Sequence, residues 1–314
     1  MTAPTIYRSD DASAPTISGT SSDLRLALNA ILVDGYGAKA AAGWAKAYED
    51  AGNHLVAYRN AGLGRYLFLD DSPTRVSVLR GYRAMASISD RSEPFPRLGL
   101  PDVTCRKSVT ADATARPWIC LANELHFFLI IFGNQTTLGS SSGSDAHLAF
   151  GELDSALPGD EYRTFIHGGS DTSATSGTAT VARQAFNFND TSVVTSPYTF
   201  CEGTIAQNAL STNSVSEAAP FANTPFSEVV SGGTTFPAYP DPATGKLLIS
   251  RQMTRHIHAT SAPVNRGYLP GLWTLCHPAT SFTSLDTFSM GSRTFLIVRT
   301  GAGGVVFETT GDSW

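Results

Sequence analysis

Apolar positions recur at helical spacing near the start of the chain. The residues that share this spacing are Leu24, Leu26 or Leu28, Ile31 and Leu32. Together they predict an amphipathic helix over residues 21–32. Ser21 or Ser22 can cap its first turn, and Gly35 supplies the stop signal at its end.

After this helix the pattern changes to short apolar runs separated by turn residues. The runs predict hairpins and single strands at 43–60, 64–71, 75–85, 116–132, 147–153 and 162–168. Gly52-Asn53 lies at the first turn, Ser72-Pro73 joins the next two runs, and residues 122–124 form the third turn. We therefore expect a mainly β fold of sandwich- or barrel-like antiparallel sheets, with one short N-terminal helix and long loops.

Two polar stretches interrupt this pattern. Residues 1–20 predict an N-terminal arm, and residues 168–195 predict a flexible joint. They delimit a β-rich portion at 21–167 and a second one at 196–314. Further strands are predicted at 245–260, 267–277, 294–300 and 304–310. Because neither polar stretch can form a core of its own, we expect both to be mobile in a lone subunit and to order against neighbouring subunits.

Two tryptophans are expected to anchor the second portion. Trp273 lies in RGYLPGLW and Trp314 in FETTGDSW, each beside turn-forming residues. An indole can bury about 150–250 Å² of surface, so neither side chain should stand free in solvent.

Composition and charge narrow the functional classes. Charged residues make up 16% of the 314 residues, against about 25% in a typical soluble protein, and the net charge is −5. No run of basic residues occurs, so we expect no nucleic-acid binding. The longest apolar run, residues 127–132, is too short to span a bilayer, and the polar N-terminus lacks the apolar core of a signal peptide. We expect a protein without a membrane span.

The stretch LVDGYGAKAAAGW, residues 32–44, matches the glycine pattern of dinucleotide-binding loops. The Gly-x-Gly-x-x-Ala pattern begins at Gly35, and Lys39 adds a positive charge. A nucleotide loop needs a strand before its glycines and a helix after them, because the helix N-terminus binds the phosphates. Here the predicted helix comes first and a strand follows. We therefore interpret the glycines as a turn that reverses the chain, with Trp44 packed over it.

Two further patterns resemble catalytic or metal sites. GSSSG at 139–143 matches the nucleophile-elbow pattern at Ser141, but no strand leads directly into it and no helix follows. His256 and His258 lie two residues apart, so on a strand they would face the same side and could bind a metal with His277. A solvated strand face explains the same pair, and we favour that interpretation.

The remaining polar candidates have ordinary structural explanations. Asp10-Asp11 and Asp70-Asp71 lie in predicted turns. The aromatic residues form no clustered stripe that would indicate a carbohydrate-binding platform. Free buried thiols are expected for the four widely spaced cysteines, which are Cys105, Cys120, Cys201 and Cys276. We assign no catalytic, cofactor-binding or metal-ligating residue, and we expect neither enzyme activity nor a cofactor.

The order of several segments resembles a family of virion structural proteins of tailed bacteriophages. The segments are PTIYRSDDASAPTISG, LVDGYGAKAAAGW, ARPWICLA, RGYLPGLW and FETTGDSW, with Arg80-Gly81-Tyr82 and Pro158-Gly159-Asp160 between them. The resemblance spans most of the chain and is weakest from 168 to 245. It implies a particle component of the tail, neck or baseplate, made in the bacterial host cytoplasm. It also implies a homo-oligomer that contacts other virion proteins.

Two other functional classes stay open at this stage. A receptor- or glycan-binding tail module is the main alternative to a purely structural role. A depolymerase or cell-wall hydrolase is a weaker one, because a glycosidase needs two carboxylates at a set separation and no motif selects such a pair among the 27 acidic residues.

Overall fold

Strands dominate the structure. The computed structural model describes residues 2–95, 102–140, 145–168, 198–202, 229–230, 233–234, 246–258, 261–275, 281–300 and 303–314. Strands account for 47% of the described residues and helical segments for 8%. The expected mainly β fold with one short α-helix is confirmed. The described strands form three large antiparallel sheets, and none of the three closes into a barrel.

The central sheet combines the start of the chain with its middle. Its spatial order is β1 (Thr5–Arg8), β8 (Trp118–Ala122), β9 (Phe127–Ile131), β10 (Ala146–Glu152), β12 (Thr164–Gly168) and β13 (Tyr198–Cys201). Every neighbouring pair is antiparallel. The hairpin predicted at 116–132 is confirmed as β8 and β9, and the strands predicted at 147–153 and 162–168 are confirmed as β10 and β12.

The second sheet is built from the strands that lie between β1 and β8 along the chain. Its strands are β2 (Ala45–Asp50), β3 (Leu55–Arg59), β4 (Tyr66–Asp70), β5 (Val76–Met85), β6 (Arg91–Phe95) and β7 (Val103–Arg106), with a 3₁₀ turn, η2 (Ala51–Asn53), between β2 and β3. The turns predicted at Gly52-Asn53 and at Ser72-Pro73 lie between β2 and β3 and between β4 and β5. Both predicted hairpins are confirmed.

The third sheet comes mainly from the end of the chain. Its strands are β11 (Asp154–Ser155), β16 (Ile249–His258), β17 (Ser261–Leu275), β18 (Thr287–Met290), β19 (Arg293–Thr300) and β20 (Gly303–Glu308), and a small separate pair is formed by β14 (Val229–Val230) and β15 (Gly233–Thr234). Strand β11 pairs with β17, and β13 pairs with β12, so strands from the two predicted portions share sheets. Residues 169–195 of the predicted joint lie outside the described residues.

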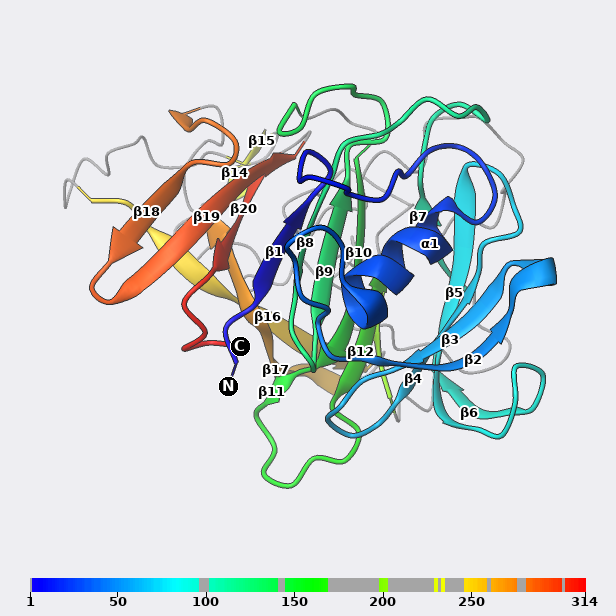
Figure 1. The fold of residues 1–314 in the computed structure, drawn as a ribbon. Helices are drawn as coiled ribbons and strands as arrows, with labels where there is room; N and C mark the ends of the chain where they lie inside the picture. The colour runs from blue at the N-terminus through cyan, green and yellow to red at the C-terminus, as the bar shows by residue number, and fades with distance from the viewer. Residues whose placement is uncertain are drawn as a thin grey trace.

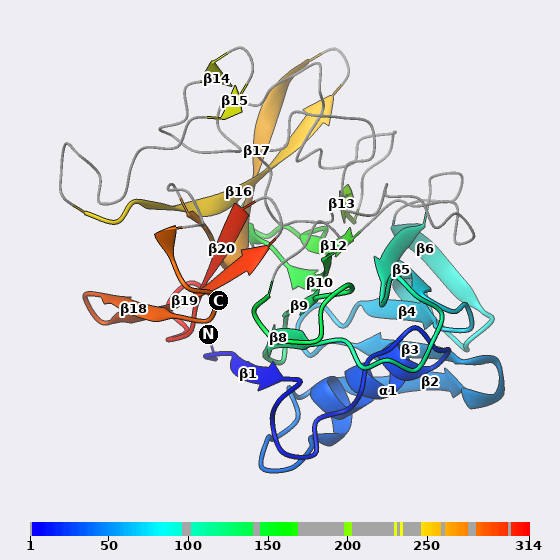
Figure 2. The same cartoon turned by 90° about the horizontal axis from the view of Figure 1, so that it is seen from above.

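The central sheet lies between the other two layers. The third sheet covers one face, and the second sheet with helix α1 (Asp23–Asn29) covers the other (Figures 1 and 2). Consecutive residues of β8 belong to different cores. Trp118, Cys120 and Ala122 pack with α1 and the second sheet, whereas Ile119 and Leu121 pack with the third sheet. This double coverage explains why the hairpin strands are apolar at almost every position instead of alternating.

The N-terminal residues are part of the central sheet. Strand β1 pairs with β8 from Thr5 to Arg8, and both Tyr7 and Ile17 are fully buried. The expectation that residues 1–20 form an arm that is mobile in a lone subunit is therefore wrong for the described residues from 2 onward. The polar composition concealed a short edge strand whose two apolar side chains, Ile6 and Tyr7, pack in the cores on opposite faces of the central sheet.

The predicted helix is confirmed, but its cap differs from the expected one. Helix α1 continues as a single π turn, η1 (Ala30–Asp34), and ends before Gly35. The Ser22 hydroxyl makes no cap hydrogen bond and instead bonds with His54. The Asp71 carboxylate accepts a hydrogen bond from the Arg25 backbone N–H at 2.9 Å. It thereby provides a partner for one of the N–H groups that the first turn of a helix leaves without one.

Asp71 also forms a fully buried ion pair with Lys107. The Lys107 ammonium donates to Asp71 and, at 2.6 Å, to the carbonyl oxygen of Thr20, and both charged side chains are inaccessible to solvent. The Ser77 hydroxyl donates to the same carboxylate at 2.6 Å. Asp71 lies in the β4–β5 turn and Lys107 directly follows β7, so the ion pair connects these two segments with the helix and the N-terminal segment.

Removing the lysine should strongly destabilise the fold. We expect Lys107→Met to lower the free energy of unfolding by about 3–5 kcal/mol, because it leaves the Asp71 charge buried without its partner. Chemical denaturation monitored by circular dichroism measures the change. Lys46→Met is the control, since Lys46 pairs with Glu49 at the surface and such pairs contribute roughly 0–1 kcal/mol. Equal effects of the two substitutions would contradict the expectation.

Trp314 is confirmed as a buried anchor. Its side chain is inaccessible to solvent, its indole N–H donates to the Glu308 carbonyl oxygen at 2.6 Å, and it packs edge-on against Phe128 of the central sheet. A Cβ added at Gly271 would lie 2.1 Å from the indole, so the glycine is required there. Trp273 is half-buried and packs edge-on against Phe295.

Replacement of Trp314 by alanine should weaken the packing of the third sheet against the central sheet. We expect Trp314→Ala to cost about 3–5 kcal/mol of stability, the usual range for a buried Trp or Phe. Thermal unfolding of the purified protein measures it, with Trp273→Ala expected to cost less because that ring is only partly buried. An unchanged melting temperature for Trp314→Ala would overturn the anchor role.

Candidate functional site

The glycine-rich stretch at 32–44 closes the outer edge of strand β1. The Lys39 ammonium donates to the Ile6 carbonyl oxygen at 2.8 Å, and the Arg8 N–H donates to the Tyr36 hydroxyl at 3.2 Å. These are backbone groups that a further strand would otherwise bind. The positive charge next to the glycines therefore has a structural partner within this chain.

The glycines themselves allow a tight turn. Gly35 and Gly37 have positive φ angles of 77° and 53°, and a Cβ at Gly37 would lie 2.3 Å from the Ala12 carbonyl oxygen. A helix precedes them and β2 follows, which is the reverse of a nucleotide loop. Trp44 is buried and packs edge-on against Phe127 at 5.7 Å. The interpretation as a reversing turn is confirmed.

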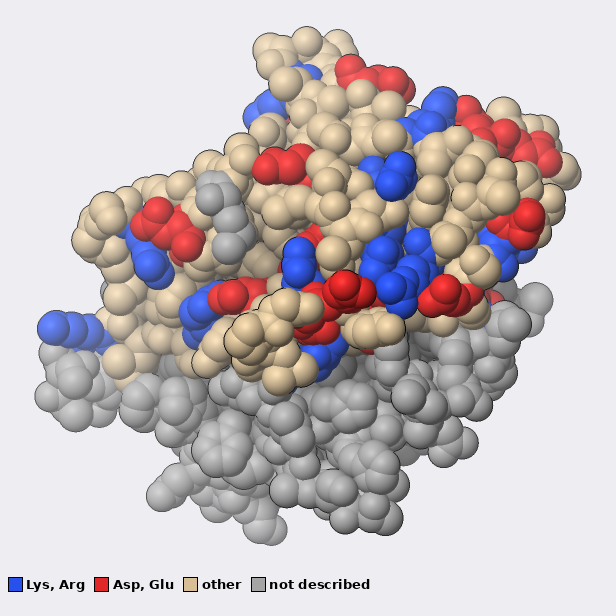
Figure 3. Space-filling view, turned by 90° about the horizontal axis from the view of Figure 1, so that it is seen from below, with Lys and Arg blue, Asp and Glu red and all other residues tan. Residues whose placement is uncertain are grey.

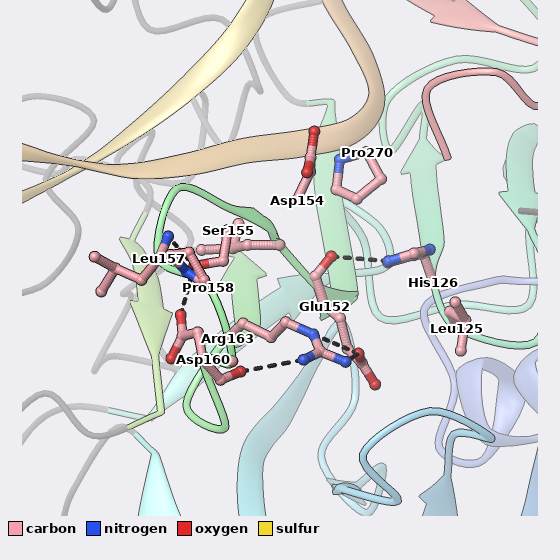
Figure 4. A pocket seen from close by; sticks show the side chains of 12 residues that line it. Leu125, His126, Glu152, Asp154, Ser155, Leu157, Pro158, Asp160, Arg163 and Pro270 are labelled. Carbon is pink, nitrogen blue, oxygen red and sulfur yellow. Dashed lines mark hydrogen bonds and ion pairs between the residues drawn. The ribbon is translucent and has the colours of Figure 1, made fainter.

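A cavity of about 430 Å³ lies where the central and third sheets meet. The loop from β10 to β12 forms one wall, the β8–β9 turn with His126 forms another, and Pro270 of β17 lies at the top (Figure 4). Within this wall the short strand β11 pairs with β17, which fixes the start of the loop to the third sheet.

Two ion pairs hold the loop in place from inside. The Arg163 guanidinium donates to Glu152 at 2.7 and 2.9 Å, and the Arg266 guanidinium donates to Asp160 at 2.7 and 3.0 Å. The Ser155 hydroxyl adds a 2.6 Å hydrogen bond to Asp160. Burial alone would raise the pKa of Asp160, but the bonds from Ser155, the Tyr162 N–H and Arg266 outweigh it and hold the pKa below its usual value. The carboxylate is therefore a fixed acceptor and not a proton donor.

His126 forms the inner wall of the cavity. Its side chain is 2% exposed, and its Nε2 lies 2.8 Å from the Glu152 carbonyl oxygen. Burial, together with the nearby Arg163 charge and partly offset by the hydrogen bond to the Glu152 carbonyl oxygen, lowers its pKa to about 4. The ring is neutral at pH 7, so Nε2 carries the proton that the carbonyl accepts. Nδ1 makes no hydrogen bond.

The loop that forms one wall of the cavity exposes a leucine and a tyrosine to solvent. Leu157 is 51% exposed and Tyr162 is 44% exposed, on either side of the Pro158-Gly159 turn. The Arg83 guanidinium packs over the face of the Tyr162 ring, 4.9 Å from its centre, in a cation–π contact. Gly159 has a positive φ of 69° and faces open space, so the turn projects from the body.

Paired charges surround this loop. Positive and negative side chains lie beside one another across the middle of the face seen in Figure 3. The ion pairs near the loop are Arg65–Glu202, Arg83–Glu202, Arg83–Glu161, Arg163–Glu152, Arg251–Asp154 and Arg266–Asp160. Because each of these charges has a partner, the arrangement stiffens the loop.

The structure does not describe the side chains of the histidine and serine candidates. Strand β16 contains His256 and His258, but their side chains lie outside what the structure describes, and the β16–β17 pairing shifts register between them. Ser141 and His277 also lie outside it. Among the described residues, no group of three or more His, Cys, Asp or Glu side chains could hold a metal ion.

The acidic pairs and cysteines have structural surroundings. Asp11 accepts the Arg8 N–H at 2.8 Å and Asp70 accepts the Ser72 N–H at 2.9 Å, as expected of turn residues, whereas Asp71 belongs to the buried ion pair. The buried free thiols expected of the cysteines are confirmed at Cys105, Cys120 and Cys201, and Cys276 lies outside the described residues. Burial raises the pKa of Cys105 to about 12, so its thiol is protonated.

The sequence alone indicated only part of the loop site. Pro158-Gly159-Asp160 was recognisable as a turn, but no local signal pairs Asp160 with Arg266 or Glu152 with Arg163. Spacing carries no information about Arg266, which lies 106 residues from Asp160 along the chain.

Comparison with known proteins adds no family to this description. The chain matches no family model and no curated protein sequence. In the part of the chain that the structure describes, none of the helices has the length and apolar content needed to cross a membrane. Function therefore has to be argued from the loop site and the sequence.

Acid should destabilise the protein through its buried histidines. Burial lowers the pKa of His126 to about 4 and that of His167 to about 3, whereas an exposed histidine titrates near 6.5. Above about pH 6.5 these histidines are neutral in both the folded and the unfolded chain, and the free energy of unfolding is at its highest. As the pH falls from 6.5 towards 4, the unfolded chain binds protons that the folded chain does not, so the free energy of unfolding decreases. We expect His126 alone to contribute on the order of 3 kcal/mol to this loss.

Urea denaturation at a series of pH values measures this dependence. The curve for His126→Gln should be flatter than that of the unchanged chain, since glutamine keeps an N–H donor and does not titrate. His54→Gln, at a half-buried position, is the control. A pH dependence that His126→Gln leaves unaltered would contradict the expectation.

Proposed function

We propose that this chain is a structural component of a tailed-bacteriophage virion, in its tail, neck or baseplate, and that it works through symmetric contacts between subunits. On this proposal it is made in the host cytoplasm, resides in the virion, contacts other virion proteins and has no enzymatic activity. The observation that carries the assembly role is the stiffened loop with exposed Leu157 and Tyr162. The phage assignment rests on the sequence resemblance.

The construction of the loop supports a contact role. An exposed leucine and an exposed tyrosine on a mobile loop would lose much conformational freedom on binding. Here the ion pairs of Asp160 and Glu152 already fix the loop in the lone chain, so docking orders little more than the side chains. Tyrosine and arginine are also enriched in the energetically important parts of interfaces, and Arg83 lies against Tyr162.

The same site supports the alternative of a receptor- or glycan-binding tail module. The cavity has a volume of about 430 Å³, and small ligands bind in concave sites of this size. The exposed Tyr162 lies on the loop that forms one of its walls. The two functions differ in what the loop contacts, which is a neighbouring subunit in one case and a host-surface molecule in the other.

Replacement of the exposed leucine tests the proposal. We expect Leu157→Glu to leave the melting temperature unchanged and to lower the copy number of the protein in purified particles at least about tenfold, because burying an unpaired carboxylate at an interface costs several kcal/mol. Leu26→Glu is the matched control, because Leu26 is 50% exposed on helix α1, away from the loop. Quantitative mass spectrometry of particles gives the copy number, and cryo-electron microscopy gives the position.

The outcomes separate the two functions. Normal incorporation of Leu157→Glu with lost adsorption to host cells would favour the receptor-binding module. Absence of the unchanged protein from purified particles would contradict a virion role of either kind. Normal incorporation together with normal adsorption would show that the loop makes neither contact.

A further inference from the structure

Among the described strands, β18 forms an open edge of the third sheet. It is the last strand in the order β11-β17-β20-β19-β18, and it projects with β19 as a hairpin away from the central sheet (Figures 1 and 2). Thr287, Ser289 and Met290 are exposed, the last of them by 44%. An edge strand of this kind presents unpaired backbone N–H and C=O groups to solvent.

Three other described edge strands, β1, β2 and β6, carry features that block further pairing. Lys39 and Tyr36 occupy the outer edge of β1. Strand β2 has a register irregularity between Lys46 and Tyr48 as well as charged side chains, and β6 contains Pro94. Strand β18 has the sequence Thr-Phe-Ser-Met, with no charge, no proline and an unbroken register against β19. Proteins usually protect exposed edges with charges, prolines and bulges, and β18 has none of the three.

The pairing with β19 determines which groups of β18 point outward. The Thr294 carbonyl oxygen accepts the Thr309 N–H, so the backbone groups of Thr294 face away from β18. Its register partner Ser289 is therefore not hydrogen-bonded to β19. By the alternation of antiparallel strands, Thr287 shares this orientation and Phe288 faces inward. The outward donors and acceptors of β18 belong to Thr287 and Ser289, with Phe288 between them.

We propose that β18 binds β18 of a second copy of this chain, antiparallel and across a two-fold axis centred on Phe288. In this register Thr287 lies opposite Ser289 of the second copy, and Ser289 lies opposite its Thr287. Both are hydrogen-bonded pairs, so all four outward N–H groups and all four outward carbonyl groups at these positions can be matched. The strand is thus complementary to itself, which is why the occupant is a second copy.

The side chains fit the same register. Phe288 lies opposite Phe288 of the second copy in a non-hydrogen-bonded pair, where side chains approach most closely. Phe288 already stacks on Phe295 with ring centres 5.1 Å apart, and Phe295 packs edge-on against Trp273 at 5.6 Å. The dimer would extend this aromatic row from one subunit into the other and would join the two third sheets into one.

The contact is small and therefore weak in isolation. Four residues per chain bury far less than the roughly 800 Å² per partner of a standard stable interface. We expect a concentration-dependent dimer that is reinforced when subunits are held together by other contacts. The inference deepens the proposed structural role, but it is tested on the purified chain without any particle.

Sedimentation equilibrium over a wide concentration range tests the dimer. We expect Ser289→Pro to raise the dimer dissociation constant at least about tenfold, because it removes one outward N–H from each chain and two hydrogen bonds from the dimer. Ser289→Ala keeps the N–H and should dimerise like the unchanged chain. Both variants should keep the far-ultraviolet circular dichroism spectrum, since that N–H is not bonded to β19. An unchanged chain that stays monomeric at its highest soluble concentration would overturn the inference.

Cysteine cross-linking tests the register independently of affinity. Under mild oxidation Phe288→Cys should form a disulfide-linked dimer, because non-hydrogen-bonded antiparallel pairs bring Cα atoms to about 4.5 Å, within the range for a disulfide. Ser289→Cys alone should not cross-link, whereas its mixture with Thr287→Cys should. The unchanged chain controls for its own cysteines. Cross-linking of Ser289→Cys with itself, or none for Phe288→Cys, would overturn the proposed pairing, whereas failure of the virion role would appear only in the particle experiments.

Discussion

The structure depends on a central sheet that is apolar on both faces. Because Trp118 and Cys120 face one way and Ile119 and Leu121 face the other, two covering layers are required. At about 25 cal/mol per Å² of apolar surface removed from water, this double burial is the dominant stabilising contribution that the fold offers. The helix, the second sheet, the third sheet and the indole of Trp314 all contribute to that coverage.

Polar interactions are concentrated where the layers meet. Asp71 and Lys107 join the N-terminal segment to the second sheet. Glu152 pairs with Arg163 across the base of the projecting loop, and Asp160 joins that loop to Arg266 of the third sheet. Buried ion pairs contribute little net stability compared with apolar replacements, but a pair with one member missing is costly. Their effect here is to specify one arrangement of the layers, and the exposed loop inherits its rigidity from them.

The sequence predicted those elements whose signals are local. The helix at 21–32 and the hairpin at 116–132 follow from spacing and turn residues alone. Strand β1 was missed because its partner β8 lies far along the chain. The cap of α1 was expected from Ser21 or Ser22, since nothing local shows that Asp71 reaches the Arg25 N–H. Likewise, Pro158-Gly159-Asp160 was recognisable as a turn, whereas its role depends on distant arginines. Contacts between layers are not encoded in spacing, and the candidate site consists of such contacts.

The order of the layers along the chain has a consequence for biosynthesis. The central sheet's β8, β9 and β10 are translated before the third-sheet strands from β16 onward. Until those strands arrive, Ile119, Leu121 and Phe128 have no cover on their side of the sheet. A nascent chain of intermediate length therefore exposes a broad apolar surface, the kind of surface that chaperones bind and that aggregates when concentrated.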